Sequence, residues 1–187
     1  MKKRAIPVRK LFLLDMNPAI RFLLISDCVW WSAAGLLGPV FALFVVDFIQ
    51  GGNAAVAGTA AAVFLISKSI FQIPIATLID RWRGERDDFW ILVIGLGVAS
   101  LMPLLYLFIS TPWQLYLVEF LFGITVAATY PSFMAIFTRH IDENKEGTEW
   151  GINMTLNDLG AGAAAAIGGV MVVTVGFKAV IIAMVVI

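Results

Sequence analysis

The chain has 187 residues, of which 60% are apolar and 14% are charged, whereas an ordinary soluble domain carries roughly 25% charged residues. A soluble domain of this length has too little interior to bury so much apolar surface, and the mean hydropathy of +0.92 indicates that lipid is the solvent. The formal net charge is zero, and the chain has one cysteine and one histidine. This composition excludes an intrachain disulfide and a histidine-rich metal site, and it predicts no nucleic-acid partner.

Five segments are long enough to cross a hydrocarbon core, which takes roughly 20 apolar residues in a helix. In chain order they cover about 22–48, 55–79, 89–109, 115–137 and 150–175. A sixth apolar run, over about 177–187, is too short to cross. Residues 1–20 form a basic tail, and residues 21–187 form the membrane domain. The sequence therefore predicts an all-α transmembrane bundle of five complete spans and a partial sixth.

Prolines, short turns and small residues predict how the spans pack. The turns over 49–54 and 110–114 are short, so spans one and two, and spans three and four, should form antiparallel hairpins. In the fifth span Gly160, Ala164 and Gly168 are spaced by four, which allows a close helix contact. Each of the first four spans also contains one proline, where membrane helices often kink: Pro39, Pro74, Pro103 and Pro131.

The distribution of lysine and arginine predicts the orientation in the membrane. Six basic residues lie in the segment that ends at Arg21, and others lie in the loops over 80–88 and 139–149, whereas the turns over 49–54 and 110–114 contain none. Cytoplasmic loops of membrane proteins are enriched in such residues. We therefore expect a multi-pass protein of the plasma or inner membrane, with its N-terminus in the cytoplasm.

The segment that follows the second span reads ATLIDRWRGER over residues 76–86. It resembles the signature G-x-x-x-D-R-x-G-R-[RK] of the loop between helices two and three of the major facilitator superfamily. Asp80 and Arg81 match directly, Ala76 takes the place of the first glycine, and Gly84 and Arg86 fit the later positions with one inserted residue. The resemblance covers about residues 17–187 and implies the N-terminal six-helix half of such a transporter. It also implies a cytoplasmic gating loop at these residues, with a solvated loop of mixed charge as the alternative.

Two other patterns of the superfamily are only partly present. Many members carry R-x-x-Q-G in helix four, where this chain has Glu119 at the arginine position and keeps the glycine as Gly123. Drug antiporters often carry G-P-x-x-G-G in helix five, and here only the pair Gly168 and Gly169 remains. The resemblance therefore does not distinguish symport, antiport and uniport.

Ionisable residues within the predicted spans are the candidates for contact with a substrate or a coupling ion. Each charge at the centre of a membrane helix costs roughly 2.5–3.5 kcal/mol on insertion scales, so it usually faces an interior or a cavity. We expect Lys68 to pair with the carboxylate of Asp27 or of Glu119, and the alternative is a purely structural pair. The complete candidate set is Asp27, Lys68, Glu119, Asn157 and Asp158.

The resemblance implies a secondary transporter of a small solute that works by alternating access, with a site at the bilayer midplane. Since the sixth span is cut short, we expect a fragment, with the other half supplied by a C-terminal continuation or by a second subunit. The alternative is a non-transporting membrane scaffold that docks a partner through span five. No phosphate-binding loop and no common hydrolase motif is present, so we expect no enzyme, no cofactor and no metal.

Overall fold

The computed structural model describes residues 16–81 and 84–187, and all regular structure in these ranges is helical. Most of the predicted basic tail, residues 1–15, lies outside the described ranges. In chain order the helices, with η marking a 3-10 helix, are α1 (Pro18–Leu37), η3 (Gly38–Val40), α2 (Phe41–Phe48), α3 (Ala54–Arg81), α4 (Glu85–Leu101), η4 (Met102–Leu107), α5 (Pro112–His140), α6 (Glu146–Val175) and α7 (Phe177–Val186).

The described residues contain five helical stretches that are long and apolar enough to cross a membrane. They are Pro18–Phe48, Ala54–Arg81, Glu85–Leu107, Pro112–His140 and Glu146–Val175, so the predicted series of five spans is confirmed. All five begin before the predicted residue; in α4 and α6 the added first turn is rich in polar residues, which hydropathy does not detect. With 10 residues, α7 rises only about 15 Å, which is too short to cross.

Local caps and one glycine set the ends of these helices. The Asn17 Oδ1 atom accepts a hydrogen bond from the Ala19 N–H at 3.0 Å, and the Asn53 Oδ1 atom accepts one from the Ala55 N–H at 2.9 Å. Both bonds satisfy N–H groups that a first helical turn leaves without partners. Between α6 and α7, Gly176 has a φ of 84°, a conformation that favours glycine because it lacks a Cβ atom.

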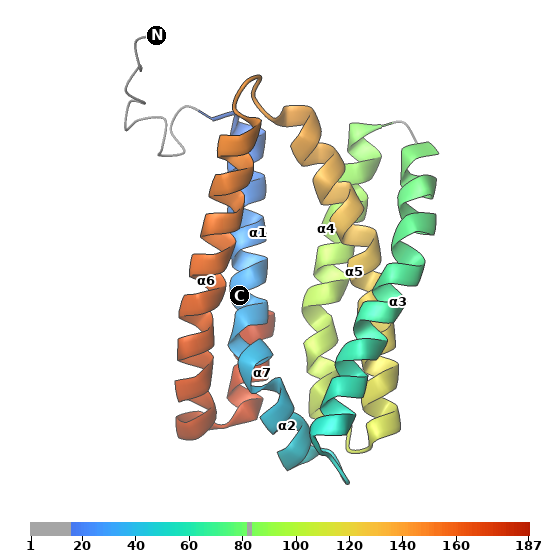
Figure 1. Ribbon diagram of the computed structural model, residues 1–187, viewed down its shortest axis with the longest axis vertical. Helices are drawn as coiled ribbons and strands as arrows, with labels where there is room; N and C mark the ends of the chain where they lie inside the picture. Colours follow the sequence, from blue (N-terminus) through green and yellow to red (C-terminus); the bar gives the residue numbers. More distant parts are fainter. Residues whose placement is uncertain (1–15, 82–83) are drawn as a thin grey trace.

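Only two of the four predicted kinks interrupt a helix. Pro39 lies in η3 and Pro103 lies in η4, so the first and third spans each contain a 3-10 segment. Pro74 and Pro131 lie inside the continuous helices α3 and α5. Proline removes one backbone donor, and local 3-10 adjustment is one way in which membrane helices accommodate it. The break at Pro39 turns α2 away from the line of α1 (Figure 1).

The helices form two groups, with α1, α6 and α7 on one side and α3, α4 and α5 on the other (Figure 1). Within the groups, α6 packs along α1, and α5 packs along both α3 and α4. We call the end at which α1 begins the charged end and the end that carries the α2–α3, η4–α5 and α6–α7 junctions the turn end. The first two spans are antiparallel as predicted, but α3 contacts the first span mainly through α2, so these spans do not form a packed hairpin.

The small residues of α6 pack against α1. A Cβ atom placed on Gly168 would lie 2.0 Å from the Leu36 carbonyl oxygen, and one placed on Gly160 would lie 2.3 Å from the Ser32 Oγ atom. Ala164, between them on the same face, is 7% exposed. The predicted close contact of span five therefore exists within this chain. The scaffold alternative is not favoured, since α1 of the same chain covers the face that carries Gly160, Ala164 and Gly168.

Two clusters of buried apolar side chains join the two groups. The cluster near the turn end includes Phe44 on α2, Leu115 on α5 and Val180 on α7. The cluster near the charged end includes Leu24 on α1 and Phe137 on α5. Members of both clusters border a cavity that lies between them, in the middle of the bundle.

Candidate functional site

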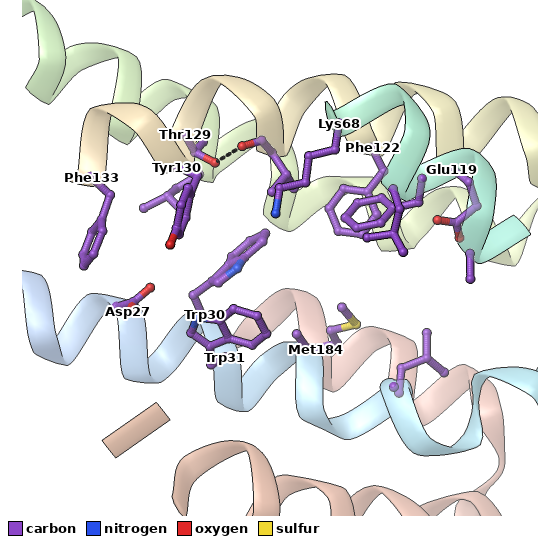
Figure 2. Close-up of a pocket in the computed structure, with 18 of the residues that line it drawn as sticks. Asp27, Trp30, Trp31, Lys68, Glu119, Phe122, Thr129, Tyr130, Phe133 and Met184 are labelled. Atoms are coloured by element: carbon purple, nitrogen blue, oxygen red, sulfur yellow. Dashed lines mark hydrogen bonds between the residues drawn. The ribbon is translucent and has the colours of Figure 1, made fainter. Parts of the chain in front are cut away.

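The cavity has a volume of about 440 Å³ and is lined by residues of both helix groups (Figure 2). One wall comes from α1, η3 and the start of α2, with Met184 from α7. The opposite wall comes from α3, α4, η4 and α5. Its volume is within the range of roughly 300–1,000 Å³ that is typical of small-molecule sites.

Aromatic side chains make up much of the cavity wall. The Phe122 ring on α5 lies 5.3 Å from the Phe64 ring on α3 and 6.5 Å from the Trp30 ring on α1, measured between centroids. Tyr130 and Phe133 on α5 extend this surface toward the charged end. Such rings offer large, rigid apolar area for a ligand of similar character.

Asp27 lies on α1 and is held by two amides of α6. The Asn157 Nδ2 group donates to the Asp27 Oδ2 atom at 2.6 Å, and the Asn153 Nδ2 group donates to the same atom at 3.1 Å. The two asparagines are one helical turn apart, so both amides reach one carboxylate. Their Oδ1 atoms are buried and have no hydrogen-bond partner among the described residues.

Glu119 lies on α5 with only 5% of its surface exposed. Its Oε1 atom accepts a hydrogen bond from the Tyr106 hydroxyl at 2.5 Å. Tyr106 comes from η4, so the bond spans the short turn between the third and fourth spans. A buried carboxylate that accepts such a bond avoids part of the cost of leaving water.

Lys68 projects from α3 into the cavity, and its Nζ atom lies 5.3 Å from the centroid of the Tyr130 ring (Figure 2). The ammonium makes no ion pair and no hydrogen bond within the described part of the chain. The predicted pair with Asp27 or Glu119 is therefore not formed. Asp27 accepts hydrogen bonds from α6 and Glu119 accepts one from Tyr106, so each carboxylate has a partner other than Lys68.

Three of the five predicted site residues line the cavity: Asp27, Lys68 and Glu119. Asn157 is placed beside it through its hydrogen bond to Asp27. Asp158 is exposed on α6 and does not line the cavity, so we leave it out of the site. Adjacent helical residues point about 100° apart, which is why Asn157 and Asp158 cannot both face α1.

The sequence reasoning missed Tyr106 as the partner of Glu119. A signal for this pair was present, since the two residues stand on either side of the short 110–114 turn, where antiparallel helices bring such positions opposite one another. It also missed the facing rings of Phe64 and Phe122, whose contact depends on how closely α3 approaches α5. That approach depends on Gly123, where a Cβ atom would lie 2.6 Å from the Phe64 carbonyl oxygen.

The predicted gating loop lies at the charged end, outside the cavity. Asp80 and Arg81 lie at the end of α3, Gly84 precedes α4, and Arg86 lies in the first turn of α4. Residues 82–83 of the loop lie outside the described ranges. Asp80 is the last residue but one of α3. The loop therefore connects two helices of the same group.

Contacts between polar side chains at this end join α4 to α5. The Glu85 Oε1 atom lies 3.0 Å from the His140 Nε2 atom. Asp88, which is 1% exposed, pairs with Arg139. The acidic residues of the first turn of α4 therefore contact basic residues at the end of α5, in addition to favouring the helix N-terminus.

Comparison with known proteins adds a family and a group of relatives. A sequence model of the Major Facilitator Superfamily matches residues 23–187. The multidrug resistance proteins MdtG of Salmonella arizonae, Salmonella paratyphi B and Salmonella newport are each 26% identical over 190 aligned residues, which cover 96% of this chain and 44% of the relative. The chain thus spans less than half the length of these curated relatives. No solved structure matched the chain.

Proposed function

This chain belongs to the Major Facilitator Superfamily, and on that premise we propose that it takes part in the transport of a small organic solute across a membrane. The observation that carries the proposal is the cavity in the middle of the bundle. It receives ionisable side chains from three different helices, Asp27 from α1, Lys68 from α3 and Glu119 from α5. Charges at this depth are costly and typically mark substrate or ion pathways.

We propose alternating access as the mechanism. The superfamily match and the span of 44% of each relative support the view that this chain forms one helical half, and that a C-terminal continuation or a second subunit supplies the other. In such transporters two bundles rock about a site near the membrane midplane. The solute is moved and not chemically converted in this scheme.

The proposed roles of the residues follow from their positions. Asp27, Lys68 and Glu119 contact the solute or a coupling ion, and Asn157 positions the Asp27 carboxylate. The aromatic wall supports an organic solute with apolar surface, and the relatives carry the name multidrug resistance protein. At the charged end we retain Asp80, Arg81, Gly84 and Arg86 as the gating loop.

A transport assay tests this proposal. Cells that express the chain, in the form in which they make it, are supplied with a panel of small organic solutes, and the initial rate of accumulation or efflux is measured. We expect Lys68→Ala and Glu119→Gln to lose most of the transport rate. Asp47→Asn is the matched control, since Asp47 is an exposed acid at the turn end. Wild-type rates in both cavity variants would contradict the proposal.

We further propose that the charged end faces the cytoplasm of a cell whose plasma or inner membrane holds the chain. The excess of lysine and arginine at that end supports this orientation. In a Cys28→Ser background, Gln50→Cys at the turn end should react with a membrane-impermeant maleimide in intact cells. Glu143→Cys, in the α5–α6 connection, should react only after the cells are opened. The reverse pattern of labelling would rule out this orientation.

A further inference from the structure

The three charged groups of the cavity differ in how the chain compensates them. Asp27 accepts two amide hydrogen bonds, and Glu119 accepts a hydroxyl hydrogen bond. The Lys68 ammonium has only the face of the Tyr130 ring, at 5.3 Å, and no carboxylate within ion-pair distance among the described residues. Of these three groups, Lys68 is therefore the one without a hydrogen-bond or ion-pair partner in the described part of the chain.

A lysine ammonium has three donors, and a ring face uses none of them as a full hydrogen bond. An anionic group of a ligand would supply both the opposite charge and the acceptors. Asp27 and Glu119, in contrast, already accept hydrogen bonds from protein donors at their Oδ2 and Oε1 atoms. The unused donors of Lys68 thus favour an anionic group on the ligand, placed at Lys68 and away from the two carboxylates.

The surroundings of Lys68 indicate what the rest of the ligand resembles. Figure 2 shows the ammonium directed into the cavity toward the side of α1 that carries Trp30. Phe122 lies beside Lys68, on the same wall of the cavity. The position of Lys68 is fixed by the close approach of α3 to α5, since a Cβ atom on Gly123 would lie 3.1 Å from the Lys68 backbone nitrogen. A cation next to facing aromatic rings suits an amphipathic anion.

We propose that the cavity selects organic anions, with Lys68 binding a carboxylate or sulfonate and the aromatic wall contacting an aromatic or alicyclic body. This inference rests on the proposed function and specifies its substrate class. In this proposal Lys68 determines which charge a ligand must carry to bind tightly, in addition to lining the cavity.

Three probes that share one ring system test the proposal. The chain, purified in the form in which cells make it, is reconstituted in nanodiscs of zwitterionic lipid. Binding of 2-naphthoate, 2-naphthylmethanol and 2-naphthylmethylammonium is measured by calorimetry, with empty nanodiscs correcting for partition into lipid. We expect the naphthoate to bind about tenfold more tightly than the neutral alcohol, because it gains a charge-assisted hydrogen bond. The ammonium probe should bind no better than the alcohol.

Variants at Lys68 then test whether this residue causes the preference for the anionic probe. In Lys68→Gln the naphthoate should lose about tenfold in affinity, while the alcohol, which reports that the cavity is intact, binds as before. Lys68→Arg should keep the preference for the anion. Lys178→Gln is the matched control, since Lys178 is an exposed lysine on α7 that does not line the cavity, and it should leave all three affinities unchanged.

The outcomes separate this inference from the proposed function. If the alcohol binds but the naphthoate binds no more tightly, or if the ammonium binds best, the selection of anions is wrong and the solute cavity stands. Equal losses for all three probes in Lys68→Gln would show that Lys68 only shapes the cavity, which also overturns the inference. If no probe binds to the wild-type chain, the proposed solute site itself fails.

Discussion

Replacing Gly168 by alanine should destabilise the contact between α1 and α6. The new Cβ atom would lie 2.0 Å from the Leu36 carbonyl oxygen, where an ordinary contact is at least 3.4 Å, so the two backbones must separate by about 1.4 Å. Overpacking of this kind costs about 1–3 kcal/mol in protein interiors. Because the obstruction is backbone and not a flexible side chain, we expect a cost toward the upper end of that range.

Thermal unfolding in detergent, followed by tryptophan fluorescence, measures this cost. A chain of this length shifts its Tm by about 2–4 °C per kcal/mol, so Gly168→Ala should lower the Tm by several degrees. The neighbouring Gly169→Ala is the matched control, since nothing lies within 4 Å of its Cβ position. It should leave the Tm unchanged or raise it slightly, because alanine is the better helix former. Equal Tm values for the two variants would refute the proposed tight packing of α6 on α1.

Two further substitutions test the polar contacts. Tyr106→Phe removes the hydrogen-bond donor to buried Glu119 and should lower the free energy of unfolding by about 1–3 kcal/mol, measured by denaturant titration in detergent. A smaller loss when Glu119→Gln is already present would confirm that the two side chains act together. Arg139→Ala leaves the Asp88 carboxylate, which is 1% exposed, without its ion-pair partner, and should cost about 1–3 kcal/mol. Exposed Arg86 provides the control, and an Arg86→Ala variant as unstable as Arg139→Ala would argue against a specific pair.

Hydropathy predicted the spans because each has to satisfy the same requirement, a run of apolar residues as long as the membrane core is thick. The small-residue spacing of α6 predicted a close contact for a similarly local reason, since it leaves one helix face without side-chain bulk. It could not identify the partner. That α1 and not another subunit covers this face depends on the path of the whole chain, and the same holds for the separation of α1 from α3.

The sequence identified individual residues of the candidate site but not the partners that they contact. The cost of burying a charge selected Asp27, Lys68 and Glu119, which line one cavity, and it also selected Asp158, which does not. Their partners required three-dimensional information, because the depth of a residue along its own helix does not specify which neighbouring helix faces it. Asn157 and Asp158 illustrate the limit, since both are polar and adjacent in sequence, and only the packing of α6 on α1 distinguishes them.

The hydrogen bond between Asn157 and Asp27 also has a consequence for biogenesis, since these residues are 130 positions apart. At synthesis rates of roughly 5–20 residues per second, the first span waits on the order of ten seconds for its partner to leave the ribosome. In contrast α3, α4 and α5 are consecutive and can associate as they emerge. We therefore expect the contact of α1 with α6 to form after α3, α4 and α5 have begun to associate. During the interval the Asp27 carboxylate lacks its amide donors, and we expect the first span to need the insertion machinery or early contacts with α5 until α6 arrives.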